Sequence, residues 1–277
     1  MDRVRASKSG MCVLCCVVLC CVVSLDSGTT YTLILVLILC VCLSLLPVVK
    51  LLDYTTSEIT MLGRHTSNPS EAGTSANACS CLAALDQDNR NILASASWNR
   101  QLCLWDCRVS SSTSTSTSRG PVATLDLPGK AFSMDVDASN HRLVVATSGR
   151  RNVVVDVRNF DTASAVLQPQ VVLDRESSLK FQTRSIRFFP DGRGFALGSV
   201  EGRVGVEVLE DLPGLPPHSM KRYAFKCHRV NDTVYPVNAI AFHPRYTTTF
   251  ATGGCDGSVV LWDGGNKKKV RRRDGIE

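Results

Sequence analysis

Four segments of this 277-residue chain share one plan and start at nearly regular intervals, at residues 80, 131, 183 and 237. Each has an alternating polar and apolar stretch, a polar turn, a second stretch rich in small residues, a two-residue turn and a third alternating stretch. Alternation with a period of two is typical of β-strands, and a period of about 50 residues is typical of repeated supersecondary units. The pattern predicts an all-β fold of repeated antiparallel sheets over 80–106, 131–158, 183–210 and 237–263.

The two-residue turns between the second and third stretches support this prediction. Asp256-Gly257, Glu201-Gly202 and Asn99-Arg100 stand at the same place in their repeats. Such a hairpin turn requires positive φ, which glycine adopts without steric cost. Trp105 and Trp262 end the third stretch of their repeats, where a large ring is expected to pack against a neighbouring sheet.

Composition is that of a globular protein, and the motifs include no catalytic constellation. Hydrophobic residues make up 44% and charged residues 20%, as in globular domains, and a net charge of +6 does not by itself indicate nucleic-acid binding. We find no P-loop, nucleophile elbow, zincin or kinase motif. Among the 13 cysteines, Cys12 and Cys15 have metal-ligand spacing, but no second pair and no nearby histidine completes a site. The five histidines are scattered without ligand spacing, so no catalytic residue, metal or cofactor is expected, and His228 is expected to make a structural hydrogen bond.

Residues 1–52 differ from the rest of the chain. A basic start precedes two apolar runs, at 11–25 and 31–49, and the second is long enough to span a bilayer. Three interpretations stay open: a signal peptide, a two-span membrane anchor that leaves residues 53–277 in the cytosol, and a wrongly assigned gene start. Residues 53–78 are polar and predict a linker, and the Ser/Thr run at 110–118 predicts a disordered loop.

The repeats and their Trp-Asp endings resemble the WD40 family, whose units are four-stranded blades of a β-propeller. Six strings resemble the spindle-checkpoint Bub family of propellers over roughly residues 79–270. They are SGRRNVVVDVRN, RESSLKFQTRSIRFFP, GSVEGRVGVEVLE, KRYAFKCHR, YPVNAIAFHP and FATGGCDGSVVLWD. A sister branch, the mRNA-export propeller of the nuclear pore, is similar in GFALGSVEGRV and KCHR.

This resemblance implies a non-enzymatic kinetochore adaptor. Its implied partners are GLEBS-type peptides of Bub-family checkpoint kinases, phosphorylated MELT motifs of a kinetochore scaffold, and ubiquitin or other checkpoint-complex proteins, with no nucleic acid. By position in the matching motifs, Trp98 and Arg184 would contact the GLEBS peptide, and Arg203 and Lys226 would hold the phosphothreonine. A guanidinium and an ammonium suit a phosphate. Without the resemblance, these cations are solvated side chains and Trp98 is a packing residue.

The implied location is the nucleus and kinetochore, with cytoplasm, and membrane contact if residues 11–49 span a bilayer. The alternatives are the mRNA-export adaptor, which would also bind RNA, and a membrane-anchored WD40 scaffold. The family's ring has seven blades, whereas residues 79–277 contain about four. We therefore expect an incomplete propeller with exposed apolar blade faces that is unstable or prone to aggregate alone. The run NKKKVRRR (266–273) is typical of either a nuclear-localisation signal or a solvated strand end.

Overall fold

The computed structural model describes residues 19–26, 31–37, 48–52, 59–65, 78–85, 92–107, 120–137, 139–161, 166–209 and 221–274. These residues form β-strands joined by turns, and the one helical element among them is a 3-10 turn at Ser148–Arg150. The strands make four four-stranded and four two-stranded antiparallel sheets. The predicted all-β fold is confirmed. The Ser/Thr run at 110–118 lies outside the described residues.

The four-stranded sheets coincide with the four repeats, and we call them the first to fourth blades. The first contains β5 (Cys79–Leu85), β6 (Ile92–Ser97), β7 (Gln101–Asp106) and β8 (Ala123–Asp126). The second contains β9 (Ala131–Asp137), β10 (Arg142–Thr147), β11 (Arg151–Asp156) and β14 (Gln170–Glu176). The third contains β15 (Thr183–Phe188), β16 (Gly194–Ser199), β17 (Arg203–Val208) and β18 (Tyr223–Lys226). The fourth contains β21 (Val237–Phe242), β22 (Thr249–Gly254), β23 (Val259–Asp263) and β24 (Lys268–Arg273).

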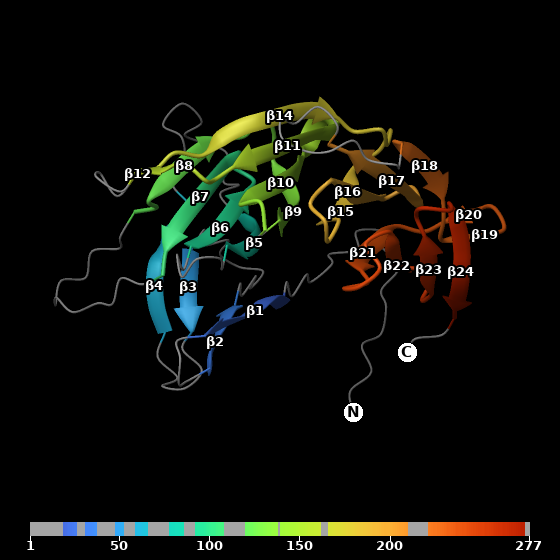
Figure 1. Ribbon diagram of the computed structural model, residues 1–277, viewed down its shortest axis with the longest axis horizontal. Helices are drawn as coiled ribbons and strands as arrows, with labels where there is room; N and C mark the ends of the chain where they lie inside the picture. Colours follow the sequence, from blue (N-terminus) through green and yellow to red (C-terminus); the bar gives the residue numbers. More distant parts are fainter. Residues whose placement is uncertain are drawn as a thin grey trace, which may run out of the picture.

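The blades follow one another in an arc (Figure 1). The first strands of successive blades lie side by side along its inner edge, with β5 beside β9, β9 beside β15 and β15 beside β21. The last strand of each blade is its outer strand. Two short hairpins lie outside the four blades. β12 (Phe160–Asp161) pairs with β13 (Val166–Leu167) in the connection between β11 and β14 of the second blade. β19 (Arg229–Val230) pairs with β20 (Thr233–Val234) in the connection between the third and fourth blades.

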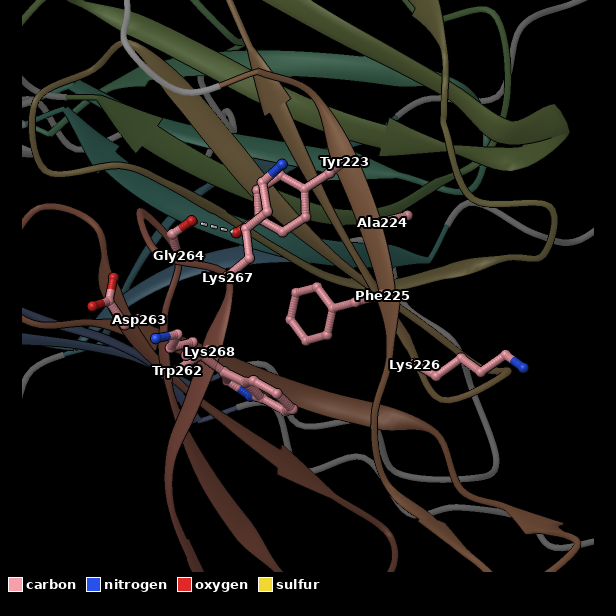
Figure 2. A pocket seen from close by; sticks show the side chains of 9 residues that line it. All are labelled: Tyr223, Ala224, Phe225, Lys226, Trp262, Asp263, Gly264, Lys267 and Lys268. Carbon is pink, nitrogen blue, oxygen red and sulfur yellow. Dashed lines mark hydrogen bonds between the residues drawn. The ribbon is translucent and has the colours of Figure 1, made fainter.

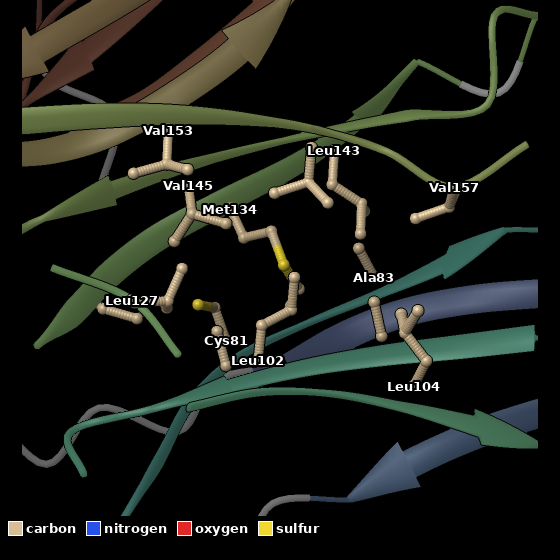
Figure 3. Close-up of a cluster of buried hydrophobic side chains, with 14 of the residues drawn as sticks. Cys81, Ala83, Leu102, Leu104, Leu127, Met134, Leu143, Val145, Val153 and Val157 are labelled. Atoms are coloured by element: carbon tan, nitrogen blue, oxygen red, sulfur yellow. The ribbon is translucent and has the colours of Figure 1, made fainter. Parts of the chain in front are cut away.

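The core consists of apolar layers between neighbouring blades. Between the first and second blades, Leu102 and Leu104 of β7 meet Met134, Leu143 and Val145 (Figure 3). All five are at most 4% exposed, and similar layers join the second blade to the third and the third to the fourth. Because each layer buries side chains from two blades, every blade depends on its neighbours for stability.

The described residues of the apolar N-terminal tract form β-strands. β1 (Leu19–Asp26) pairs with β2 (Tyr31–Leu37), and β3 (Val48–Leu52) pairs with β4 (Ile59–Arg64). β2 lies beside β3, and β1 lies beside β5, which extends the inner row of strands by one unit. No helix in the described part of the chain is long and apolar enough to cross a membrane.

The predicted linker at 53–78 contains β4 and His65, and this part packs on the first blade. Val49 and Leu62 join the apolar cluster around Trp105 and Leu93, and the His65 ring is 1% exposed. The ring centroids of His65 and Trp105 are 6.1 Å apart in an edge-to-face arrangement. The described residues of β3 and β4 therefore cover the face of the first blade that points away from the second.

The corresponding face at the other end of the arc is uncovered by described residues. In the third blade, Val204 lies opposite Gly198 and is fully buried against the fourth blade. In the fourth blade, Val259 lies opposite Gly253 in the same register, and its exposed fraction is 36%. The predicted exposure of an apolar blade face is therefore confirmed at this end.

Candidate functional site

The loop that follows the third blade is anchored by a buried hydrogen-bonded group. His228 Nδ1 lies 2.8 Å from Asp256 Oδ1, and His228 Nε2 lies 2.8 Å from Thr252 Oγ1. The indole N–H of Trp262 donates to the same Thr252 oxygen at 2.9 Å. Burial alone would raise the pKa of the Asp256 carboxyl, but hydrogen bonds from Ser258 and His228 outweigh it and hold this pKa below its usual value. The structural role expected for His228 is confirmed.

This loop meets the Glu201-Gly202 turn of the third blade. Gly202 has φ +62°, and a Cβ there would lie 2.7 Å from the Cys227 carbonyl oxygen, so a larger residue does not fit. The Gly202 carbonyl accepts a hydrogen bond from the Cys227 amide at 2.9 Å. The turn and the loop therefore hold β17 and β18 in register up to their ends.

The two predicted phosphate-binding residues lie on these strand ends. Arg203 of β17 and Lys226 of β18 are directly opposite each other in the register, so their side chains leave the same face of the sheet. Lys226 is exposed, and the Arg203 side chain is 37% exposed with its Nε 3.4 Å from Glu201 Oε1. The structure brings these two cations together.

A third cation, Arg229, adjoins this pair and was missed by sequence reasoning. Its Nη2 donates to the Glu201 carbonyl oxygen at 3.1 Å. Within the described residues, the Nε of Arg229 is buried without a hydrogen-bond partner, whereas the Nε of Arg203 is within ion-pair distance of Glu201. Guanidinium donors without partners can accommodate an anion, and the only sequence signal was the basic run of KCHR.

A groove of about 330 Å³ lies next to Lys226, between the outer strands of the third and fourth blades (Figure 2). Its floor is aromatic: the rings of Phe225 and Trp262 have centroids 4.6 Å apart, and Tyr223 stacks on Phe225 at 6.0 Å. The Tyr223 hydroxyl donates to the Gly264 carbonyl at 2.8 Å. Burial and the nearby Asp263 charge raise the pKa of Tyr223 to about 12, so the hydroxyl stays protonated.

The two residues predicted to contact a GLEBS peptide lie at one end of the blades but not together. Trp98 is in the turn between β6 and β7 of the first blade, with 39% of its surface exposed. Arg184 is at the start of β15 in the third blade, and its Nε donates to Asn238 Oδ1 at 3.3 Å. In each blade, the first strand begins at the same end of the sheet as the turn between the second and third strands, so both residues lie at that end. The second blade lies between the first and third blades and therefore separates the two residues.

The groups on this surface suit ligand binding. Within the described residues, no cluster of three or more His, Cys, Asp or Glu side chains has a geometry that would hold a metal ion. Cations, exposed aromatic rings and a groove are the features that recognise anionic, extended peptides.

Comparison with known proteins identifies repeats in two of the blades. The family model for the WD domain, G-beta repeat, matches residues 70–106 and 220–263, which include the first and fourth blades' Trp-Asp strands. The first and fourth blades therefore contain WD40 repeats. The first and fourth blades each bind a histidine, a small hydroxyl residue and a tryptophan in one hydrogen-bonded group, since His65, Ser95 and Trp105 repeat the arrangement of His228, Thr252 and Trp262. His65 lies just before the first matched segment, whereas His228 lies within the second.

The WD40 chain is similar to curated checkpoint and export proteins. Mitotic checkpoint protein bub3 of Dictyostelium discoideum is 42% identical over 182 residues, which cover 64% of this chain and 49% of that protein. Mitotic checkpoint protein BUB3.1 of Arabidopsis thaliana is 48% identical over 178 residues, 63% of this chain and 47% of that protein. Protein RAE1 of Arabidopsis thaliana is 38% identical over 154 residues, which cover 55% of this chain and 39% of that protein. The WD40 chain thus spans about half the length of the curated relatives it matches.

A solved structure shares the fold. A chain of the structure described as "Crystal Structure of Mitotic Checkpoint Complex" aligns with a TM-score of 0.59 at 14% identity, over 88% of this chain and 60% of that chain. At this identity the likeness shows the propeller architecture. Together, the relatives and the repeats confirm the predicted incomplete WD40 propeller related to the checkpoint Bub family.

Proposed function

We propose that this WD40 chain is a non-enzymatic checkpoint adaptor that binds a phosphothreonine-containing peptide on the outer side of its third blade. The observation that carries the proposal is the opposed pair of Arg203 and Lys226, with Arg229 beside it. A phosphate with two negative charges needs more than one cation to be selected over an unmodified threonine. The similarity to Bub3 proteins supports a phosphorylated MELT motif of a kinetochore scaffold as the ligand.

The same adaptor is proposed to hold a GLEBS-type peptide of a checkpoint kinase across the end of the blades that carries Trp98 and Arg184. An exposed tryptophan supplies a large apolar contact, and an arginine pairs with a peptide carboxylate. The exposed fraction of Trp98 supports its availability for such a contact. This role implies a nuclear and kinetochore location with a cytoplasmic pool.

Fluorescence anisotropy of a phosphorylated MELT peptide with the full chain tests the phosphothreonine site. We expect Arg203→Ala and Lys226→Ala each to weaken binding roughly tenfold or more, because each removes a charge-assisted hydrogen bond. Lys221→Ala, an exposed cation just before the same strand, is the matched control. Equal affinity for the unphosphorylated peptide, or for the wild type and both variants, would refute the site. A GLEBS peptide and Arg184→Glu test the second surface in the same way.

An mRNA-export adaptor is the second candidate function, and the similarity to Protein RAE1 favours it. Crosslinking of the tagged chain in cells separates the two candidates. Recovery of polyadenylated RNA and location at the nuclear rim would support export, whereas recovery of checkpoint kinases and location at kinetochores would support the checkpoint role.

A further inference from the structure

The basic run at residues 267–273, most of which forms the outer strand of the fourth blade, accounts for the whole net charge of the chain. The chain has 31 Lys and Arg against 25 Asp and Glu, and six of the cations lie in residues 267–273. The rest of the chain therefore has equal numbers of basic and acidic residues. Five of the six lie in β24, where all six residues are exposed.

No other blade has an outer strand of this kind. The outer strands β8, β14 and β18 read ATLD, QVVLDRE and YAFK, whereas β24 reads KKVRRR. Within the described residues, Arg272 is the one cation of β24 in a salt bridge, with Asp256 at 3.5 Å and with Asp274. Lys268 lies opposite Asp263 and contributes to the lowered pKa of that carboxyl, for which hydrogen bonds from Asn266 are the larger cause.

The cations point to both faces of the sheet. Arg271 and Arg273 lie opposite Leu261 and Val259, on the uncovered face of the fourth blade. Lys269 lies opposite Trp262, on the face that meets the third blade. A nucleic-acid backbone would contact one face and leave half of these charges unused, whereas an added strand presents side chains to both faces.

The position of β24 at the edge of its sheet also favours the addition of a strand. In the described residues β24 pairs with β23 on one side and ends the sheet on the other, so its outer edge offers backbone donors and acceptors. Cations on an edge strand deter pairing with a second copy of the same strand. They are complementary to a strand that carries carboxylates, because opposite charges across a β-ladder are stabilising.

We propose that the outer edge of β24 binds an extended acidic peptide as a fifth strand of the fourth blade. Its carboxylates pair with Lys269, Arg271 and Arg273, and its backbone continues the ladder. Lys226 and Lys268 of β24 line the same groove, but the three paired cations and the ladder edge lie on β24 itself, so the proposal does not depend on the proposed function.

The test measures the affinity of the full chain for a fluorescein-labelled peptide, Glu-Glu-Thr-Glu-Glu-Val-Glu-Glu. A second peptide has proline in place of Thr and Val, which keeps the charge but removes donors that a ladder needs. We expect the first peptide to bind roughly tenfold tighter or more. Equal affinity for both peptides would refute strand addition. Tighter binding of oligothymidine than of either peptide would overturn the peptide assignment in favour of a nucleic acid.

Substitutions locate the site. Lys269→Gln, Arg271→Gln and Arg273→Gln together are expected to weaken binding of the first peptide roughly tenfold or more, because three exposed ion pairs are lost. The matched control replaces three exposed cations elsewhere, Lys130, Lys221 and Arg245, with glutamine and should bind like the wild type. Equal losses in the two triple variants would refute the β24 location.

Two further variants keep the test decisive. If the triple variant of β24 does not fold, Arg273→Gln alone should weaken binding about two- to threefold, and an unchanged affinity would count against the proposal. Arg203→Ala should leave binding of this unphosphorylated peptide unchanged. A loss there as large as in β24 would assign the acidic peptide to the proposed phosphothreonine site instead.

Discussion

Trp262 and His228 both bind the hydroxyl of Thr252, one through its indole N–H and the other through Nε2. Asp256 closes this group in the fourth blade by binding His228 Nδ1. The first blade repeats the group through Ser95 but differs at its end, because His65 Nδ1 faces the Cys103 thiol at 3.4 Å. Among the described residues, His228 therefore has a carboxylate partner and His65 has none.

This difference predicts an acid-sensitive first blade. Burial without a counter-charge lowers the pKa of His65 from 6.5 to about 4. Below pH 6.5 the unfolded chain takes up the proton before the folded chain does, so stability falls with pH until the folded pKa is reached. The loss should be about 2 kcal/mol between pH 7.5 and pH 5. Urea unfolding at both pH values measures it, and His65→Gln, which does not titrate there, should remove most of the difference.

The carboxylate of Asp256 is expected to stabilise the fourth blade. Asp256→Ala leaves the buried His228 and Ser258 without their shared acceptor, which should cost about 2 kcal/mol or more. Because hydrogen bonds hold the pKa of Asp256 below its usual value, the stabilisation is fully present above pH 4 and declines as pH falls towards the folded pKa. Urea unfolding at pH 7 checks this, with Asp232→Ala at an exposed position as the control, and equal losses in both variants would contradict it.

The uncovered face of the fourth blade gives a matched pair of substitutions. Val259→Lys places a charge on an exposed face and should raise solubility with little change in stability. Val204→Lys, at the same position of the third blade, buries a charge at a site with no exposure and should destabilise by several kcal/mol, roughly 3–5. Static light scattering and thermal unfolding distinguish them. A Val259→Lys variant that unfolds as readily as Val204→Lys would show that this face is covered.

Thiol reactivity is expected to report the packing of the blades. Burial, with the nearby Asp126 and Asp256 charges, raises the pKa values of Cys103 and Cys227 to about 12, whereas Cys255 is exposed. The thiolate is the reactive form, so iodoacetamide at pH 7.5 should label Cys255 at least about a hundredfold faster than the other two. Peptide mass spectrometry gives the three rates. Comparable rates in native conditions would mean that the interblade layers open readily.

The repeats predicted the blades well because their signal is local. Gly202 and Gly257 have the positive φ expected of the two turns, at 62° and 69°, and Arg100 takes the same conformation at 66° in the repeat without glycine. The outer strands were harder to predict. β24 is a strand although its sequence gave two interpretations, since a solvated outer strand lacks the alternation that marks a buried one.

Other features depend on contacts that sequence patterns do not contain. In the apolar runs at 11–25 and 31–49, polar and apolar residues do not alternate with the period of a helix or a strand. The length of the runs alone favoured helices over the strands β1 and β2. The pairing of Arg203 with Lys226 follows from the register of two strands separated by a long connection. The groove between Tyr223, Phe225 and Trp262 depends on how two blades meet, and no motif marks it.

The layered arc has a consequence for the order in which the chain loses its structure. The second and third blades each pack against a neighbouring blade on both faces, whereas the fourth blade packs against one neighbour among the described residues. In a row of units with nearest-neighbour coupling, opening begins at the unit with the weakest coupling and proceeds inward. Amide hydrogen exchange should therefore be fastest in β22 and β23, slower in β16 and β17, and slowest in β10 and β11. A uniform rate across these strands would show that the arc opens as a single cooperative unit.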